Sequence, residues 1–317
     1  MRKVDAIEFS RRIFTVVDNI GKVVVGKTQV IELLLTALLA GGHVLLEDVP
    51  GVGKTLMAKA LARSLNLEFR RIQFTPDLLP ADVLGVNIYS QKTGEFVFNP
   101  GPIMTNILLA DEINRATPRT QSSLLEAMEE RQFTVDGVTR RLKEPFLVLA
   151  TQNPVEMEGT FPLPEAQLDR FLMRLRLGYP ELEEERSILH RFGAGNPLEE
   201  IKPVLNAEDI LAMREQAKGV NVDESVEYYM LTVIRETRNH PAVKLGASPR
   251  ASLLLYKCAK AFAAIKGRDY VIPDDIKHLA VPVLSHRLLL SYESLLRDYK
   301  PEDVITDILE KTAVPVE

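Results

Sequence analysis

Short apolar or β-branched runs alternate with segments of helical periodicity between residues 43 and 178. This alternation is typical of consecutive strand–helix–strand units, which form a parallel sheet with helices on its faces. Several runs are hydrophobic almost throughout, as expected for strands that are covered on both sides. We therefore predict an α/β fold with a parallel five-stranded sheet. The expected strands are HVLLED (43–48), FRRIQF (69–74), TNILLADE (105–112), FLVLATQN (146–153) and FLMRLRLG (171–178).

Two segments interrupt the alternation. Residues 77–103 are rich in turn-forming residues and contain two short extended runs. Residues 131–146 place Asp136-Gly137 between β-prone flanks, which is a strong signal for a β-hairpin. Both segments are predicted to be insertions that project from the sheet.

The rest of the chain is helical in character. The segment TQVIELLLTALLA (28–40) is apolar almost all round, which predicts a buried helix before the first strand. In the second half the periodicity is helical, and Ser248-Pro249 is a typical helix start. We therefore divide the chain into an α/β domain over residues 1–180 and an all-helical domain over residues 181–317. The helices expected in the second domain are 181–192, 206–218, 223–238, 249–266 and 273–289.

Composition limits the possible functions. The chain has 46% hydrophobic and 26% charged residues, a globular profile, and its net charge of −5 argues against a general affinity for nucleic acid. The five histidines lack metal-ligand spacing and Cys258 is the single cysteine. We therefore expect neither a transition-metal site nor an intramolecular disulfide. Because the N-terminal residues lack an apolar signal core and no apolar run is long enough to span a bilayer, we expect a cytoplasmic protein without membrane insertion.

A glycine-rich loop follows the first expected strand and precedes a helix. Its glycines would let backbone N–H groups surround phosphate oxygens, and the helix would direct its positive end toward them. Lys54 would contact the β- and γ-phosphates, and the Thr55 hydroxyl would bind Mg²⁺. We therefore predict an ATP-binding loop. Its cofactor-binding residues would be Gly51, Val52, Gly53, Lys54, Thr55 and Leu56.

Asp48 stands where the general template G-x-x-x-x-G-K-[ST] has its first glycine. A carboxylate near a triphosphate is electrostatically unfavourable, so the alternative interpretation is a strand-to-helix turn with an exposed lysine. Residue 48 falls at the expected end of the strand, where its side chain can turn away from the phosphates. We expect Asp48 to cap or brace the loop without contacting phosphate.

Polar residues also end the next two central strands. Asp111, as in a Walker B element, would hold Mg²⁺ through water, and Glu112 would polarise the water that attacks the γ-phosphate. The alternative, an ordinary acidic strand end, is less plausible after a phosphate-binding loop. Asn153 can orient the attacking water or simply start the turn before Pro154, and the spacing leaves both interpretations open.

The motifs DVPGVGKT, ILLADEINRA, LATQNP, EAQLDRF and GASPRA together resemble those of the AAA+ ATPases, and within them of the MoxR family. The resemblance runs from about Val24 to the C-terminus with the motifs in the family's order. It implies an αβα sandwich followed by a smaller all-α lid. Residues 77–103 would be the helix-2 insert and residues 131–146 the pre-sensor 1 hairpin, both facing the central pore of a ring.

The resemblance assigns roles to two arginines. Arg170 matches the arginine finger, which projects into the ATP site of the neighbouring subunit and stabilises charge on the transferring phosphoryl group. Its alternative is a surface charge pair with Asp169. Arg250 matches sensor 2, a contact to the γ-phosphate, and the resemblance leaves open whether it acts on its own nucleotide or on the neighbour's.

Other matches are weaker. Val24, Val25 and Gly26 resemble the segment that packs on adenine, although core packing explains them equally well. Gln73 stands where related enzymes restrain the Walker B glutamate, and Arg115 is a candidate second contact to the neighbour. Structural roles are equally plausible for both.

The leading hypothesis is an ATP-hydrolysing, chaperone-like remodelling ATPase that acts as a hexameric ring on protein clients. The resemblance further implies a partner with a von Willebrand A domain and clients that are matured or loaded with metal cofactors. A nucleic-acid motor is the alternative, supported by Arg140, Arg141 and Lys143 beside the hairpin and opposed by the acidic balance. A nucleotide-binding switch with negligible turnover is disfavoured by Glu112 and Asn153.

Overall fold

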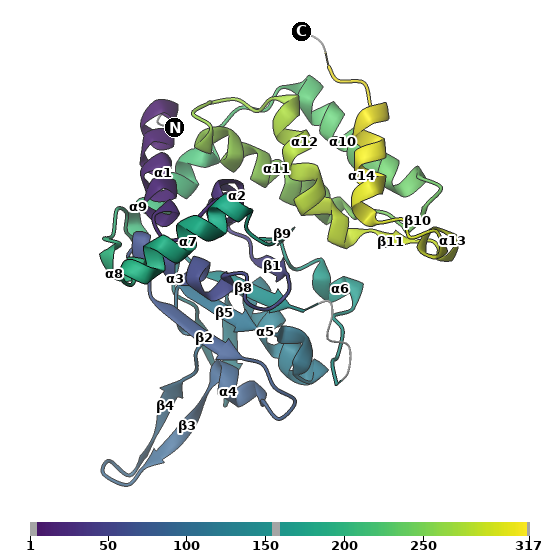
Figure 1. Cartoon of the computed structure of the whole chain (residues 1–317). Coiled ribbons are helices and arrows are strands. Elements are labelled where there is room, and N and C mark those ends of the chain that lie inside the picture. The colour runs from purple at the N-terminus through teal and green to yellow at the C-terminus, as the bar shows by residue number, and fades with distance from the viewer. Residues whose placement is uncertain (1–4, 154–158, 316–317) are drawn as a thin grey trace.

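The computed structural model describes residues 5–153 and 159–315. Its centre is a five-stranded parallel sheet with the strand order β2-β5-β8-β1-β9 (Figure 1). This confirms the predicted fold class, and every strand lies within the segment expected for it. The strands are β1 (Val44–Glu47), β2 (Phe69–Gln73), β5 (Ile107–Asp111), β8 (Leu147–Gln152) and β9 (Met173–Leu175).

Both faces of the sheet are covered. Successive strand residues point to opposite sides, and the residues on each side are buried in a separate apolar core. Val44 and Leu46 belong to an apolar core shared with α1 (Ala6–Gly21), α2 (Thr28–Ala40) and α3 (Lys54–Ser64). Leu45 belongs to a second core, which is shared with α5 (Pro118–Glu130). The result is the αβα sandwich that the sequence predicts.

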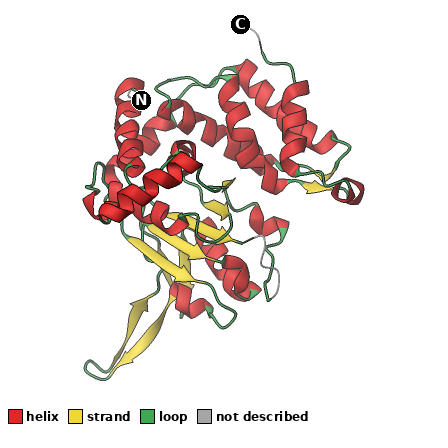
Figure 2. Cartoon of the chain, viewed as in Figure 1, coloured by secondary structure: helices red, strands yellow, loops and turns green. Residues whose placement is uncertain are grey.

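The first core continues into the helices of the second half. Buried residues of these helices pack in one cluster with α1, α2 and α3, and Figure 2 shows helices dominating the upper part of the molecule. The helices after β9 are α7 (Leu182–Ala194), α8 (Pro197–Glu200), α9 (Ala207–Ala217), α10 (Glu224–Asn239), α11 (Pro249–Ile265), α12 (Pro273–Leu284), α13 (Tyr292–Leu296) and α14 (Pro301–Lys311). Over the described ranges, no helix combines the length and apolar character needed to cross a membrane.

The helix expected over residues 273–289 is shorter in the structure. It ends at Leu284 and is followed by a 3-10 turn, Ser285–Arg287. The turn lets the Arg287 guanidinium reach the Phe171 carbonyl at 2.6 Å and the Asp169 carboxylate at 2.8 Å. Beyond it, β11 (Leu289–Leu290) pairs with β10 (Val243–Leu245), so a short β-ribbon accompanies the helices.

Both predicted insertions form antiparallel hairpins. The first, preceded by α4 (Pro80–Leu84), consists of β3 (Gly85–Ser90) and β4 (Glu95–Pro100) and extends away from the sheet (Figure 1). The second consists of β6 (Gln132–Val135) and β7 (Val138–Arg141). At its tip Asp136 has φ 50° and Gly137 has φ 77°, as a tight two-residue turn requires. The hairpins touch, since Asn87 Nδ2 donates to Asp136 Oδ2 at 2.6 Å.

Candidate active site

A cavity of about 410 Å³ opens at the carboxyl ends of β1, β2, β5 and β8. Ligands of open parallel sheets bind at this edge. The cavity brings together most of the residues that the sequence predicts to act on nucleotide. It is lined by Pro50, Gly51, Gly53, Lys54, Thr55, Leu56, Arg71, Gln73, Asp111, Glu112, Thr151 and Asn153.

The glycine-rich loop takes a backbone conformation that explains its glycines. Gly51 has φ 87° and Gly53, the N-cap of α3, has φ 93°. An added Cβ would meet nothing within 4 Å at either position, so the left-handed backbone, rather than crowding, requires glycine. The N–H groups at the start of α3 have no partners within the helix and make a natural anion site.

Lys54 begins α3 and folds back over the loop. Its Nζ donates to the carbonyl oxygens of Asp48 at 2.7 Å and Val49 at 3.3 Å. Burial lowers the pKa of the Lys54 ammonium below its ordinary value, while nearby carboxylates of Asp48, Asp111 and Glu112 oppose that shift. The side chain thus lies in the cavity with its charge directed at the loop carbonyls.

Asp48 turns away from the cavity, as expected. The buried carboxylate accepts hydrogen bonds from the backbone N–H groups of Leu177, at 2.5 Å, and Gly178, at 3.1 Å. These contacts fix the beginning of the loop to the segment that follows β9. The structure therefore agrees with a bracing role for this residue.

The acidic residues Asp111, which ends β5, and Glu112, which follows it, are held by different donors. Asp111 accepts from the Thr151 hydroxyl at 2.6 Å and from the Arg71 guanidinium at 2.6 Å. Glu112 has φ 55°, an uncommon value for a residue other than glycine. Its Oε2 accepts from Gln73 Nε2 at 2.7 Å and from Arg115 Nη1 at 2.8 Å. One oxygen of Glu112 is therefore occupied by two protein donors.

Sequence reasoning missed Arg71 and Thr151. Arg71 lies two residues before Gln73 on β2, so both side chains share one face of the strand. Thr151 lies two residues before Asn153 and bonds both to Asp111 and to the Glu112 N–H, at 2.8 Å. Alternation along each strand is a signal that could have drawn attention to them.

Some predicted residues lie outside this cavity. Val52 packs against the apolar core, and neither Val25 nor Gly26 is among the lining residues. Gly26 lies against the start of α7, where an added Cβ would come within 1.7 Å of Glu184 Oε1.

Arg170 and Arg250 converge on one carboxylate far from the cavity. Arg170 Nε lies 3.2 Å from Glu129 Oε2, and Arg250 Nη1 donates to Glu129 Oε1 at 2.7 Å. Glu129 is in the last turn of α5, and the adjacent Arg131 donates to the carbonyl of Gly41 ahead of β1 and to that of Phe146 ahead of β8. The cluster thus lies at the amino ends of the strands, opposite the cavity.

The sheet order, the loop after β1, the acidic pair at the end of β5 and the amide after β8 define a P-loop ATPase of the AAA class. The model of the ATPase family associated with various cellular activities (AAA) matches residues 43–173. The AAA lid domain model matches residues 235–308. Nucleotide binding and ATPase activity are the general properties of this class.

The similar proteins define the family more narrowly. Chaperone MoxR1 of Mycobacterium tuberculosis is 46% identical over 94% of this chain and 81% of its own length. The uncharacterized protein YeaC of Bacillus subtilis is 54% identical over 95% of this chain and 94% of its own. A solved structure from Cytophaga hutchinsonii superposes with a TM-score of 0.92, at 42% identity, and covers 98% of this chain and 97% of that one. The chain belongs to the MoxR family of AAA+ ATPases.

Proposed function

We propose that this chain hydrolyses ATP as part of a hexameric homo-oligomeric ring that remodels protein clients. One observation carries the proposal. Lys54, Glu112 and Asn153 line one cavity, whereas Arg170 and Arg250 lie at the opposite edge of the sheet on Glu129. A head-to-tail neighbour would bring these arginines to the cavity and complete the site.

The cavity has the donors that ATP and Mg²⁺ need. The N–H groups from Gly51 to Leu56 would surround the phosphates, with Val25 and Gly26 near the adenine. The Lys54 ammonium would exchange the loop carbonyls for the β- and γ-phosphates. Thr55 and Asp111 offer the hard oxygen ligands that Mg²⁺ prefers, and the ion would neutralise phosphate charge.

Hydrolysis requires an activated water. Glu112 would accept hydrogen bonding from that water and polarise it, and Asn153 would orient it. In the structure Gln73 and Arg115 occupy Oε2 of Glu112. We therefore assign Gln73 as a restraint on Glu112 that is released when the site is complete.

The arginines would act between subunits. Both guanidinium groups, released from Glu129, would meet the phosphoryl group in the neighbour's cavity and stabilise the charge that develops there. The location of Arg250 beside Arg170 favours action on the neighbour's nucleotide over action on its own.

The proposed clients and partner rest on the family. A relative is named a chaperone, which supports action on protein clients. We propose from the family resemblance alone that the protein is cytoplasmic, that it matures clients or assists metal-cofactor insertion, and that its partner has a von Willebrand A domain. A nucleic-acid motor finds less support. Arg140 stacks over the Phe98 ring at 3.8 Å, and Lys143 pairs with Glu68 at 2.6 Å.

Subunit mixing tests the proposal. Lys54→Ala should abolish ATP binding, and Arg170→Ala should retain binding but lose turnover. A mixture of the two inactive variants should regain ATPase activity, because an intact Arg170 from one subunit completes the intact cavity of the other. Hydrolysis at the wild-type rate by a strictly monomeric Arg170→Ala protein would refute the shared site.

A further inference from the structure

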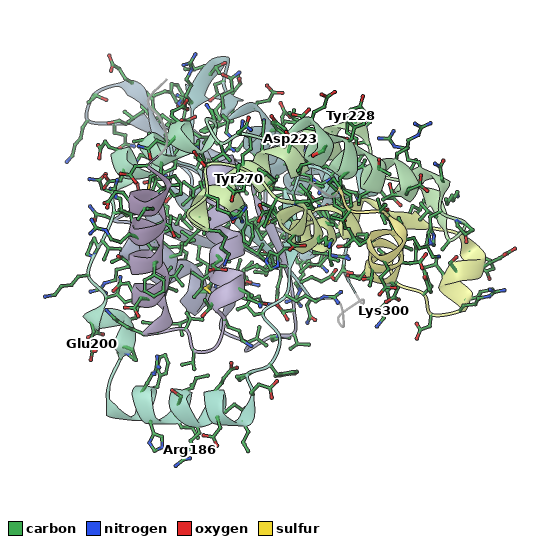
Figure 3. The ribbon with its side chains drawn as sticks, turned by 90° about the horizontal axis from the view of Figure 1, so that it is seen from above. Arg186, Glu200, Asp223, Tyr228, Tyr270 and Lys300 are labelled. Atoms are coloured by element: carbon green, nitrogen blue, oxygen red, sulfur yellow. The ribbon has the colours of Figure 1, made fainter. Side chains whose placement is uncertain are left out.

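Helix α7 exposes an apolar stripe. Leu182 is 79% exposed, Leu189 is 74% exposed and Phe192 is 37% exposed. Their spacing of seven and ten residues places them on one helix face. Figure 3 shows α7 at the edge of the molecule, with Arg186 directed away from the body. Such a stripe on a helix surface is typical of an interaction site.

The opposite side of α7 attaches it beside the nucleotide cavity. Lys27 Nζ donates to the Tyr179 carbonyl at 3.0 Å, just ahead of the helix, and lies 3.8 Å from Glu184. Arg191 donates to the Gly21 carbonyl at 2.8 Å. Asp48, at the carboxyl end of β1, also holds the segment between β9 and α7. Helix α7 therefore begins at the carboxyl-end edge of the sheet, where the phosphate loop lies.

A groove of about 240 Å³ lies between α2, α9 and α11. Apolar side chains and four cationic ones line it, and no acidic residue does. Two of the cations have acidic neighbours outside the lining: Lys218 is paired with Glu215 at 2.6 Å, and the Glu227 carboxylate lies near Lys260. Within the described part of the chain, Nε of Arg214 is buried without a hydrogen-bond partner. The lining residues are Leu39, Ala40, Arg214, Ala217, Lys218, Leu253, Tyr256, Lys257, Lys260 and Ala261.

This groove is continuous with the arginine cluster. On α11, Arg250, Leu253, Lys257 and Lys260 recur at intervals of three, four and three residues, so they form one stripe along the helix. On the α9 side of the groove, Arg214 donates to the Leu38 carbonyl at 2.9 Å. Leu38 is three residues before Gly41, whose carbonyl accepts from Arg131. The groove therefore belongs to the edge that carries Arg170 and Arg250, and α7 belongs to the edge that carries the cavity.

We propose that α7 of one copy docks in the α2–α9–α11 groove of the next copy. Leu182 and Leu189 would pack against Leu253 and Tyr256. Glu185 on α7 would face Lys257 and Lys260, while Glu183 stays paired with Arg186 at 3.5 Å. This inference rests on the proposed ring, because the head-to-tail contact that brings Arg250 to the neighbouring cavity also carries the groove toward the neighbour's α7. A contact between two different surfaces of identical subunits closes into a ring when the rotation permits.

Cross-linking tests the contact directly. Leu189→Cys combined with Leu253→Cys should give a ladder of covalent oligomers with a short bismaleimide and ATP. Cys258 will not interfere, because it is fully buried and burial raises the pKa of its thiol to about 12. The matched control is Leu189→Cys with Tyr228→Cys, since Tyr228 is 65% exposed and lies away from α7 in Figure 3. It should give no ladder.

A charge exchange provides the second test. Glu185→Lys and Lys257→Glu should each raise the apparent dissociation constant for ATP-dependent assembly about fivefold, the upper range for a partly exposed ion pair. The double variant should return to the wild-type value. Failure of the wild-type chain to assemble with ATP would overturn the ring and this contact together. Assembly with normal subunit mixing, but with neither a ladder nor a response to the charge changes, would overturn the docking of α7 alone.

Discussion

The bracing role of Asp48 gives the sharpest prediction, because two physical accounts of this residue predict opposite changes in ATP affinity when its carboxylate is removed. Its buried carboxylate accepts two backbone hydrogen bonds. Hydrogen bonds to a charged group contribute about 1.5–3 kcal/mol each, and a buried N–H without a partner is costly. Asp48→Ala should therefore lower the free energy of unfolding by about 3 kcal/mol. Asp48→Asn retains one acceptor and should lose about 2 kcal/mol.

The effect on ATP affinity separates the two accounts. If Asp48 braces the loop, its removal loosens the phosphate cradle and weakens ATP binding. If its charge mainly repels the triphosphate, removal strengthens binding. The measurements are urea-induced unfolding followed by circular dichroism and ATP binding by calorimetry. Asp18→Ala, at an exposed position on α1, is the control and should change stability by less than about 0.5 kcal/mol. Unchanged stability with tighter ATP binding in Asp48→Ala would refute the bracing account.

Three further outcomes are expected. Gln73→Leu removes one of the two donors to Glu112 Oε2 and should raise the basal ATPase rate up to about tenfold. That factor corresponds to the free energy of about one hydrogen bond to a charged group. A lower rate would contradict the restraint. Arg287→Leu removes a guanidinium that is 2% exposed and paired with Asp169. The free energy of unfolding, measured by urea titration, should therefore fall by about 3–5 kcal/mol. Burial holds the pKa of both His43 and His286 well below the ordinary 6.5, so the unfolded chain binds the extra protons and stability falls as the pH drops below that value. Between pH 7.5 and 5.5 the loss should be about 3 kcal/mol for the pair, and His286→Gln should remove about half of it.

The sequence reveals those parts of the fold that depend on local pattern. The apolar runs mark all five strands of the sheet, and the glycine loop and the pair Asp111-Glu112 fall where the motifs indicate. The hairpin at Asp136-Gly137 is equally local, because the two residues of its turn must adopt positive φ.

Partners that meet across strands are harder to predict. Arg71 bonds to Asp111, and Thr151 bonds to Asp111 from the other side. Both contacts depend on β5 lying between β2 and β8, an order that differs from the order along the chain. The early end of α12 has a similar origin, since the partners of Arg287 lie more than 100 residues away, at Asp169 and Phe171.

Glu129 pairs with both of the arginines that the proposed ring assigns to a neighbouring subunit. Without Glu129, the carboxylate left beside these two guanidinium groups in the described part of the chain would be Asp169, which lies 3.8 Å from Arg250 Nε and is also paired with Arg287. The side chains of these pairs are 30% to 41% exposed, and ion pairs of that kind contribute about 0–1 kcal/mol each. In the proposed ring, release of both arginines would therefore cost only about 1–2 kcal/mol. An arginine that stabilises phosphoryl transfer contributes a factor of about 10³–10⁵ in rate, equivalent to about 4–7 kcal/mol. In the proposed ring, the exchange from Glu129 to the neighbour's nucleotide would thus be favourable in the transition state. Completion of the site would then depend on the presence of a neighbour rather than on a barrier within the chain.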